Sequence, residues 1–204
     1  WIEAEDYDGG IIPTENLLTS TEVITENYNG EGKTVYAAVD RAKGQNGIFV
    51  PQGDVTISNV TIDGQNGATE AGEGYRGIYI TKGGDYILDG VTIKNVSYAI
   101  NVNTTEDVTL TVKNSTLEGW TSFGNSTTAS FEKVKFECGK FANFKPYTSV
   151  ILTDCSFEEG FMIDFTSLTG TITLKNCTYN GTVLTAENFA TVVSKIDGTP
   201  NVAF

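Results

Sequence analysis

The chain has 204 residues, with 13 basic and 26 acidic side chains and a formal net charge of −13. A surface of that charge repels nucleic acid and anionic membranes, and no apolar run has the length of a membrane span, so neither nucleic acid binding nor membrane insertion is expected. The length allows one domain with a sizeable core. Because the first residue is Trp1 and not Met, we expect a mature or excised chain.

The first predicted element is a short helix near the N-terminus. Apolar residues in Thr34–Ala42 recur at helical spacing, and Gly44 follows as a stop signal. The exposed end of a repeat array needs a cap. We therefore predict that residues 1–33 form an N-terminal segment with a cap strand, and that the helix closes this end of the fold.

From residue 55 onward, a nine-residue pattern recurs six times and gives the strongest signal in the sequence. The copies are Val55–Asp63, Tyr86–Lys94, Leu110–Glu118, Ala129–Glu137, Val150–Glu158 and Ile172–Asn180. Repeats at intervals of roughly 20–24 residues are typical of solenoids, in which each unit stacks on its neighbours. The repeat therefore predicts that the chain winds coil upon coil.

Each copy alternates apolar and polar residues, and the alternation slips by one residue at its centre. Apolar residues at positions three, six and eight predict two short strands that meet at a corner. Position five is that corner, where residues that tolerate a left-handed backbone predominate. The corner residues are Asn59, Gly90, Asn114, Lys133, Asp154 and Asn176. Lys133 departs from this preference, so we expect the weakest corner there.

A third strand is expected after most copies, at Gly77–Thr81, Ala99–Asn103, Phe141–Lys145, Phe161–Phe165 and Thr182–Ala186. Three strands per coil predict an all-β fold, a right-handed single-stranded parallel β-helix of about six or seven coils over residues 34–196. A helix at Ala186–Ile196 is expected to cap its C-terminal end, before a tail at 197–204. An antiparallel β-sandwich is the alternative fold, but the same slip in every copy disfavours it.

These features resemble the right-handed β-helix superfold of pectate lyases and related polysaccharide-active enzymes. The resemblance rests on the Asn corners, on the opening Thr34–Gly53 and on the VTI-x-N-x-T-I lines of the repeat. It is closest in style to secreted bacterial β-helix repeat proteins, which implies a secreted or cell-surface location. The opening Ile2–Asp8 (IEAEDYD) separately resembles the first strand of family 6 carbohydrate-binding modules. Because the β-helix hosts hydrolases, lyases, adhesins and passive modules, the fold alone does not give the function.

Position nine of the repeat carries the sharpest hypothesis for an ion site, because Glu118, Glu137 and Glu158 should stack on consecutive coils. Stacked carboxylates repel one another, and a bound Ca²⁺ would remove that repulsion. With Lys135 or Lys140 as the base, this arrangement would suit a Ca²⁺-dependent polysaccharide lyase. The chain contains no His, and a solvated acidic face is the simpler interpretation, so the balance is against an enzyme.

Aromatic and cationic side chains near the strand connections predict a contact surface. Tyr75 and Arg76 lie at the base of a polar, Gly-rich excursion, and Tyr98, Trp120 and Tyr147 lie in or next to connections. Exposed rings at such places can stack on pyranose rings, whereas buried ones would pack under the loops.

We therefore predict a non-catalytic extracellular module for adhesion or carbohydrate contact on a bacterial surface protein, with a glycan or another surface protein as its partner. A Ca²⁺-dependent polysaccharide lyase, or another carbohydrate-active enzyme, is the first alternative. A structural spacer is the second. No cofactor other than calcium is considered, and the sequence indicates no particular oligomeric state.

Overall fold

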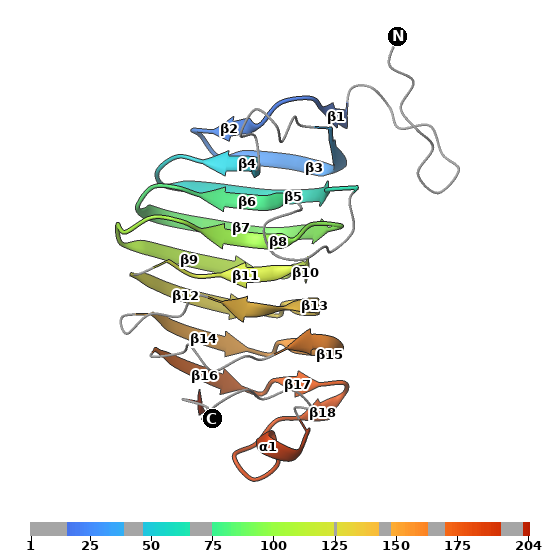
Figure 1. Cartoon of the computed structure of the whole chain (residues 1–204), viewed down its shortest axis with the longest axis vertical. Helices are drawn as coiled ribbons and strands as arrows, with labels where there is room; N and C mark the ends of the chain where they lie inside the picture. Colours follow the sequence, from blue (N-terminus) through green and yellow to red (C-terminus); the bar gives the residue numbers. More distant parts are fainter. Residues whose placement is uncertain are drawn as a thin grey trace, which may run out of the picture.

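A computed structural model describes residues 16–38, 47–65, 75–124, 126–142, 148–162, 170–192 and 202–204. These residues form an all-β parallel β-helix, whose strands stack like rungs along the longest axis of the molecule (Figure 1). The predicted fold class is therefore confirmed, while the right-handed winding and the number of coils stay predictions. No helix in the described part of the chain is long and apolar enough to cross a membrane.

The nine-residue copies form one row of strands, which we call the repeat sheet. Its strands are β1 (Leu17–Leu18), β3 (Tyr28–Ala37), β5 (Val55–Asp63), β7 (Gly84–Lys94), β9 (Val108–Lys113), β10 (Thr116–Glu118), β12 (Thr127–Glu132), β13 (Lys135–Ala142), β14 (Ser149–Thr153), β15 (Ser156–Met162), β16 (Thr171–Lys175), β17 (Thr178–Tyr179), β18 (Thr182–Val183) and β19 (Val202–Ala203). Among the described strands, only the β17–β18 pair is antiparallel. The repeat thus stacks each copy on the next with the same strand direction.

A second row of parallel strands, which we call the third-strand row, completes the coils. It contains β2 (Glu22–Ile24), β4 (Gly47–Pro51), β6 (Arg76–Ile80), β8 (Tyr98–Val102), β11 (Trp120–Ser122) and the last residues of β13. Strands β6 and β8 confirm the third strands predicted from residues 77 and 99, each beginning one residue earlier. The strands predicted from residues 141 and 161 are present up to 142 and 162, where the described residues end. Strand β11 was not predicted.

Equivalent positions of successive copies lie next to each other along the repeat sheet. Leu88 of β7 pairs with Val112 of β9, and Val112 pairs with Phe131 of β12. Positions three, six and eight of all copies are buried as predicted, with at most 4% of any of these residues exposed. Toward the C-terminal end aromatic rings fill the interior, and those of Phe136 and Phe157 stack with their centroids 5.0 Å apart. The core is therefore a continuous column inside the coils.

The predicted corners are confirmed by the backbone angles at position five. All six residues there have a positive φ, between 47° at Asn114 and 65° at Gly90. The corner N–H of Asn114 donates a hydrogen bond to the carbonyl oxygen of Glu132 in the next coil at 3.0 Å. The Asn114 side-chain Nδ2 donates to Oδ1 of Asp89 in the preceding coil at 2.8 Å. An Asn corner thus connects three successive coils, which explains the preference for this residue type.

The N-terminal helix predicted at Thr34–Ala42 is wrong over the described residues, because Tyr28–Ala37 is strand β3. Residues Lys33–Tyr36 pair in parallel with Val60–Asp63, so β3 is a further copy of the repeat. The insertion Gly30–Gly32 takes the place of the single corner residue, which hid this copy from the pattern. Strands β1 and β2 also precede the predicted boundary at residue 34, so stacking begins earlier than expected.

At the C-terminal end, the predicted helix is confirmed in part as α1 (Phe189–Val192), and residues 193–196 lie outside the described chain. Strand β18 does not extend the third-strand row but folds back on β17. The two residues between them, Asn180 and Gly181, have φ of 44° and 77°, which is typical of a two-residue hairpin turn. The hairpin and α1 occupy the C-terminal end of the coils (Figure 1), and β19 pairs with β16 there.

Replacing Lys133 should stabilise the fold, because its φ of 54° is costly for a residue with a long side chain. We expect Lys133→Gly to raise the free energy of unfolding by about 1 kcal/mol, since only a surface ion pair with Glu132 at 3.8 Å is lost. The measurement is the thermal midpoint followed by circular dichroism. Lys113→Gly, one residue before a corner in strand β9, is the matched control and should lower the midpoint. A lower midpoint for Lys133→Gly would contradict this account of the corners.

Candidate functional site

The third-strand row places three of the predicted contact residues side by side. Arg76 is the first residue of β6, Tyr98 of β8 and Trp120 of β11. Arg76 pairs with Tyr98, and Tyr98 pairs with Trp120, in parallel register. Lys140 follows on the next coil, because Thr121 after Trp120 pairs with Phe141. We call these four residues, Arg76, Tyr98, Trp120 and Lys140, the aromatic column.

Side-chain contacts hold the aromatic column together. The rings of Tyr98 and Trp120 meet edge to face, with centroids 5.5 Å apart and planes at 73°. The Arg76 guanidinium lies 5.5 Å from the centre of the Tyr98 ring, and the Lys140 ammonium lies 4.2 Å from that of Trp120. All four residues are half-buried, so each is accessible to a ligand. The column therefore runs cation, ring, ring, cation along the axis of the helix.

Glycine positions the Trp120 end of the column. Gly119 has a φ of 115°, and a Cβ there would lie 2.8 Å from the Val96 carbonyl oxygen. The absence of that atom lets the chain turn sharply into β11, where the Trp120 N–H donates to the Ser97 carbonyl at 2.9 Å. Gly139 recurs one coil later, directly before Lys140. A glycine followed by a large side chain is thus a sequence signal for the Trp120 and Lys140 positions of the column, whereas Arg76 and Tyr98 follow other residues.

The remaining predicted contact residues do not join the column. Tyr75 is 8% exposed and belongs to the core, and its carbonyl oxygen accepts hydrogen bonds from the N–H groups of Ser97 and Tyr98. Tyr147 lies outside the described residues. Sequence reasoning missed Tyr79, whose ring centre lies 5.1 Å from the Arg76 guanidinium. Asn103 Nδ2 donates to the Tyr79 hydroxyl at 2.7 Å and fixes that ring.

A lysine compensates part of the negative charge of the acidic residues predicted to hold calcium. Lys135 Nζ lies 2.9 Å from Oε1 of Glu137 and 3.6 Å from Oε1 of Glu158, so one ammonium serves both carboxylates. A register shift between Leu117 and Glu118 sets Glu118 opposite Cys138. Among the described residues, no group of three His, Cys, Asp or Glu side chains is gathered closely enough to hold a metal ion. The Glu118, Glu137 and Glu158 calcium site stays a prediction that these contacts do not favour.

The two lysines considered as catalytic bases are also engaged. The hydrogen bond to Glu137, together with the charges of Glu137 and Glu158, raises the pKa of Lys135. A higher pKa keeps the amine protonated at neutral pH and makes it a poorer base. Lys140 lies over the Trp120 ring. Neither lysine is therefore placed as a free amine facing a substrate carbon.

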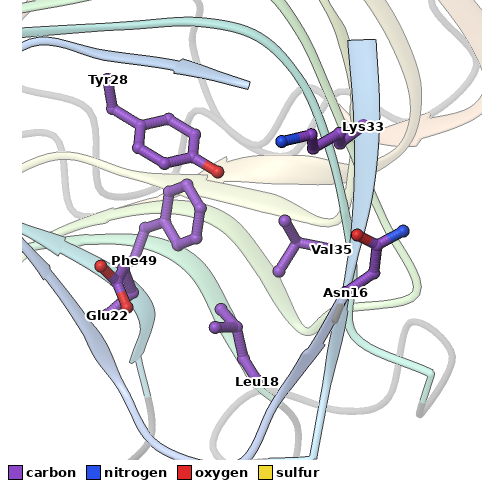
Figure 2. A pocket seen from close by; sticks show the side chains of 7 residues that line it. All are labelled: Asn16, Leu18, Glu22, Tyr28, Lys33, Val35 and Phe49. Atoms are coloured by element: carbon purple, nitrogen blue, oxygen red, sulfur yellow. The ribbon is translucent and has the colours of Figure 1, made fainter. Parts of the chain in front are cut away.

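A cavity of about 270 Å³ opens at the N-terminal end of the coils (Figure 2). Apolar and polar side chains line it together, namely Leu18, Val35, Tyr28, Phe49, Asn16, Glu22 and Lys33. The rings of Tyr28 and Phe49 meet edge to face at 5.1 Å. Burial, and then the charge of nearby Glu22, raises the pKa of Tyr28, so its phenol stays neutral. The acid and the base of this lining are not paired with each other among the described residues, because Lys33 pairs with Glu31 at 3.9 Å.

Comparison of the chain with protein-family models, with curated proteins and with solved structures found no significant match to any of them. The interpretation of the site therefore depends on its own geometry.

Calcium should have no specific effect on this fold, because the Lys135 ammonium already lies close to both Glu137 and Glu158 and lessens the repulsion between them. We expect the thermal midpoint of the wild-type chain to be the same in excess calcium chloride as in magnesium chloride of equal ionic strength. In Lys135→Gln the two carboxylates lose their cation, and the midpoint should fall and become more sensitive to salt. A calcium-specific rise in the wild type would contradict the compensation and restore the predicted ion site.

Proposed function

We propose that this chain is a non-catalytic module that contacts carbohydrate through the aromatic column. The proposal includes adhesion as its role and a secreted or cell-surface setting, in keeping with an extracellular polymer as partner. The single observation that carries it is the half-buried Tyr98–Trp120 pair, whose rings meet 5.5 Å apart on adjacent parallel strands. Two accessible rings held by the backbone register are a preformed platform.

The chemistry of pyranose rings fits such a platform. The axial C–H groups of a sugar form an apolar patch that packs on an aromatic face, while its hydroxyls remain free for polar contacts. Tyrosine and tryptophan suit this task because each combines a large apolar body with a polar group. Adjacent strands lie about 4.8 Å apart, so the column presents contacts at regular intervals along one line. A polymer with regularly repeated units can therefore occupy several contacts at once.

The pairing of the charged side chains also favours binding over catalysis. Glycoside hydrolysis needs two carboxyl groups about 5–10 Å apart across the scissile bond, and lyase chemistry needs a free base. The best-placed base, Lys135, is paired with two carboxylates. Buried Asp63, 3% exposed, is likewise paired with Lys94 at 3.3 Å. These groups serve the packing of the coils, which supports a binding role without chemistry.

Loss of the Trp120 ring should weaken glycan binding. We expect a glycan array to give hits with the wild-type chain, and titration calorimetry on those hits to show about a tenfold loss of affinity for Trp120→Ala, equal to about 1.4 kcal/mol. Ile151→Ala is the matched control, because Ile151 is an exposed apolar residue of β14 in the repeat sheet, and it should bind like the wild type.

Two outcomes would contradict this proposal. Equal losses for Trp120→Ala and Ile151→Ala would show that the aromatic column is not the contact surface. An array without hits, with the fold intact by circular dichroism, would leave a structural spacer or a protein partner as the role of the chain.

A further inference from the structure

Arg76 occupies an unusual environment at one end of the aromatic column. Its guanidinium lies near two rings, 5.1 Å from the centre of Tyr79 and 5.5 Å from that of Tyr98. The Tyr79 hydroxyl is bonded to Asn103, and Tyr98 is packed on Trp120, so both rings have fixed positions. The guanidinium is therefore held in one orientation before any ligand arrives.

The charge of Arg76 lacks an anionic partner among the described residues. The ion pairs found there join Lys33, Lys94, Lys133 and Lys135 to carboxylates, and Arg76 is in none of them. Its Nε is buried and has no hydrogen-bond partner in the described chain. The chain has 26 acidic and 13 basic residues, so carboxylates are abundant, and yet none of those in the described residues pairs with Arg76. A partly desolvated cation without one is ready to bind an anion from outside.

The residue type supports the same conclusion. The chain has eleven lysines and only two arginines, Arg41 and Arg76. Arginine differs from lysine because its planar fork stacks on rings with its faces and still offers N–H donors at its edge to two oxygens. At Arg76 the ring contacts among the described residues use none of the N–H donors in a hydrogen bond, which leaves donors for a planar or tetrahedral oxyanion.

We propose that Arg76 is an anion-recognition residue and that the glycan bound by the column carries a carboxylate or sulfate group beside it. The net charge of −13 repels dense polyanions such as nucleic acid, so a single anionic group needs this local cation to be bound. This inference rests on the proposed carbohydrate contact and specifies its ligand. A sugar ring stacked at Tyr98 and Trp120 places its neighbour one strand spacing away, about 4.8 Å along the column, beside Arg76. The ring platform supplies the apolar contact, and the guanidinium selects the charged sugar.

The test compares matched ligands that differ only in charge. A uronic acid oligosaccharide is titrated beside its methyl ester, and a sulfated oligosaccharide beside its desulfated form, which together distinguish carboxylate from sulfate. We expect the wild-type chain to bind at least one acidic form at least tenfold more tightly than its neutral counterpart. Arg76→Gln should bind the acidic and the neutral form with equal affinity, because the anionic group loses its partner. Arg76→Lys should keep part of the preference for the acidic form, because a lysine supplies charge without the fork.

Lys175→Gln is the matched control, since Lys175 is an exposed cation of β16 in the repeat sheet, away from the column register. It should leave the acidic preference unchanged. Equal losses for Arg76→Gln and Lys175→Gln would mean that net charge alone governs binding, and would overturn the inference. Equal wild-type affinity for acidic and neutral forms would also overturn it, yet would leave the carbohydrate contact standing. Failure of every glycan to bind would remove the proposed function itself.

A second variant tests for an anion supplied by the chain. Glu70 and Glu73 precede Arg76 in the sequence and lie outside the described residues. If Arg76 is open to external anions, the double variant Glu70→Gln/Glu73→Gln should bind the acidic ligand as the wild type does, within about twofold. A tenfold gain would show that these carboxylates occupy the guanidinium, and would overturn the assignment. Thermal midpoints of all variants confirm that folded protein is compared.

Discussion

The whole structure depends on a left-handed corner that recurs at the same place in successive coils. At three corners the backbone N–H donates a hydrogen bond to the coil that follows. Besides Asn114, Lys133 donates to the Thr153 carbonyl at 3.0 Å, and Asp154 donates to the Lys175 carbonyl at 2.9 Å. A slip by one residue would break these bonds and turn the apolar positions outward. The corner therefore fixes the register, and the register decides which side chains become neighbours.

The aromatic column is a consequence of that register. Arg76, Tyr98 and Trp120 are more than twenty residues apart from one to the next in sequence, yet occupy paired positions on adjacent strands. None of them needs a loop to position it, because each stands on the first residue of a strand. Surfaces built on stacked strands lose little conformational freedom when a ligand binds, and this preorganisation favours recognition of an extended polymer.

The sequence predicted the features that repeat in every coil. It did not predict contacts between residues at different positions of the repeat. The inward positions and the corners were predictable because each copy repeats the same requirement. The copy of the repeat in strand β3 was not predicted, because Gly30–Gly32 replaces its single corner residue. The spacing of the apolar residues after this insertion also fits a helix. The ion pair of Lys135 with Glu137 was not predicted, because Lys135 was considered as a base and Glu137 as a calcium ligand. Tyr98, Trp120 and Arg76 were identified singly, but connections of variable length concealed that the three are neighbours.

The most direct test of the stacking is a pair of distances measured by pulsed electron paramagnetic resonance. Nitroxide labels would be placed at position seven, on Thr61 with Ser156 and on Thr61 with Thr178, after Cys138 is replaced by Ser; the other two cysteines are buried. The account predicts narrow distributions centred near about 19 Å and 24 Å, which differ by one strand spacing. Distances that are broad, or that do not lengthen by one spacing from the first pair to the second, would contradict the winding on which the core, the corners and the aromatic column depend.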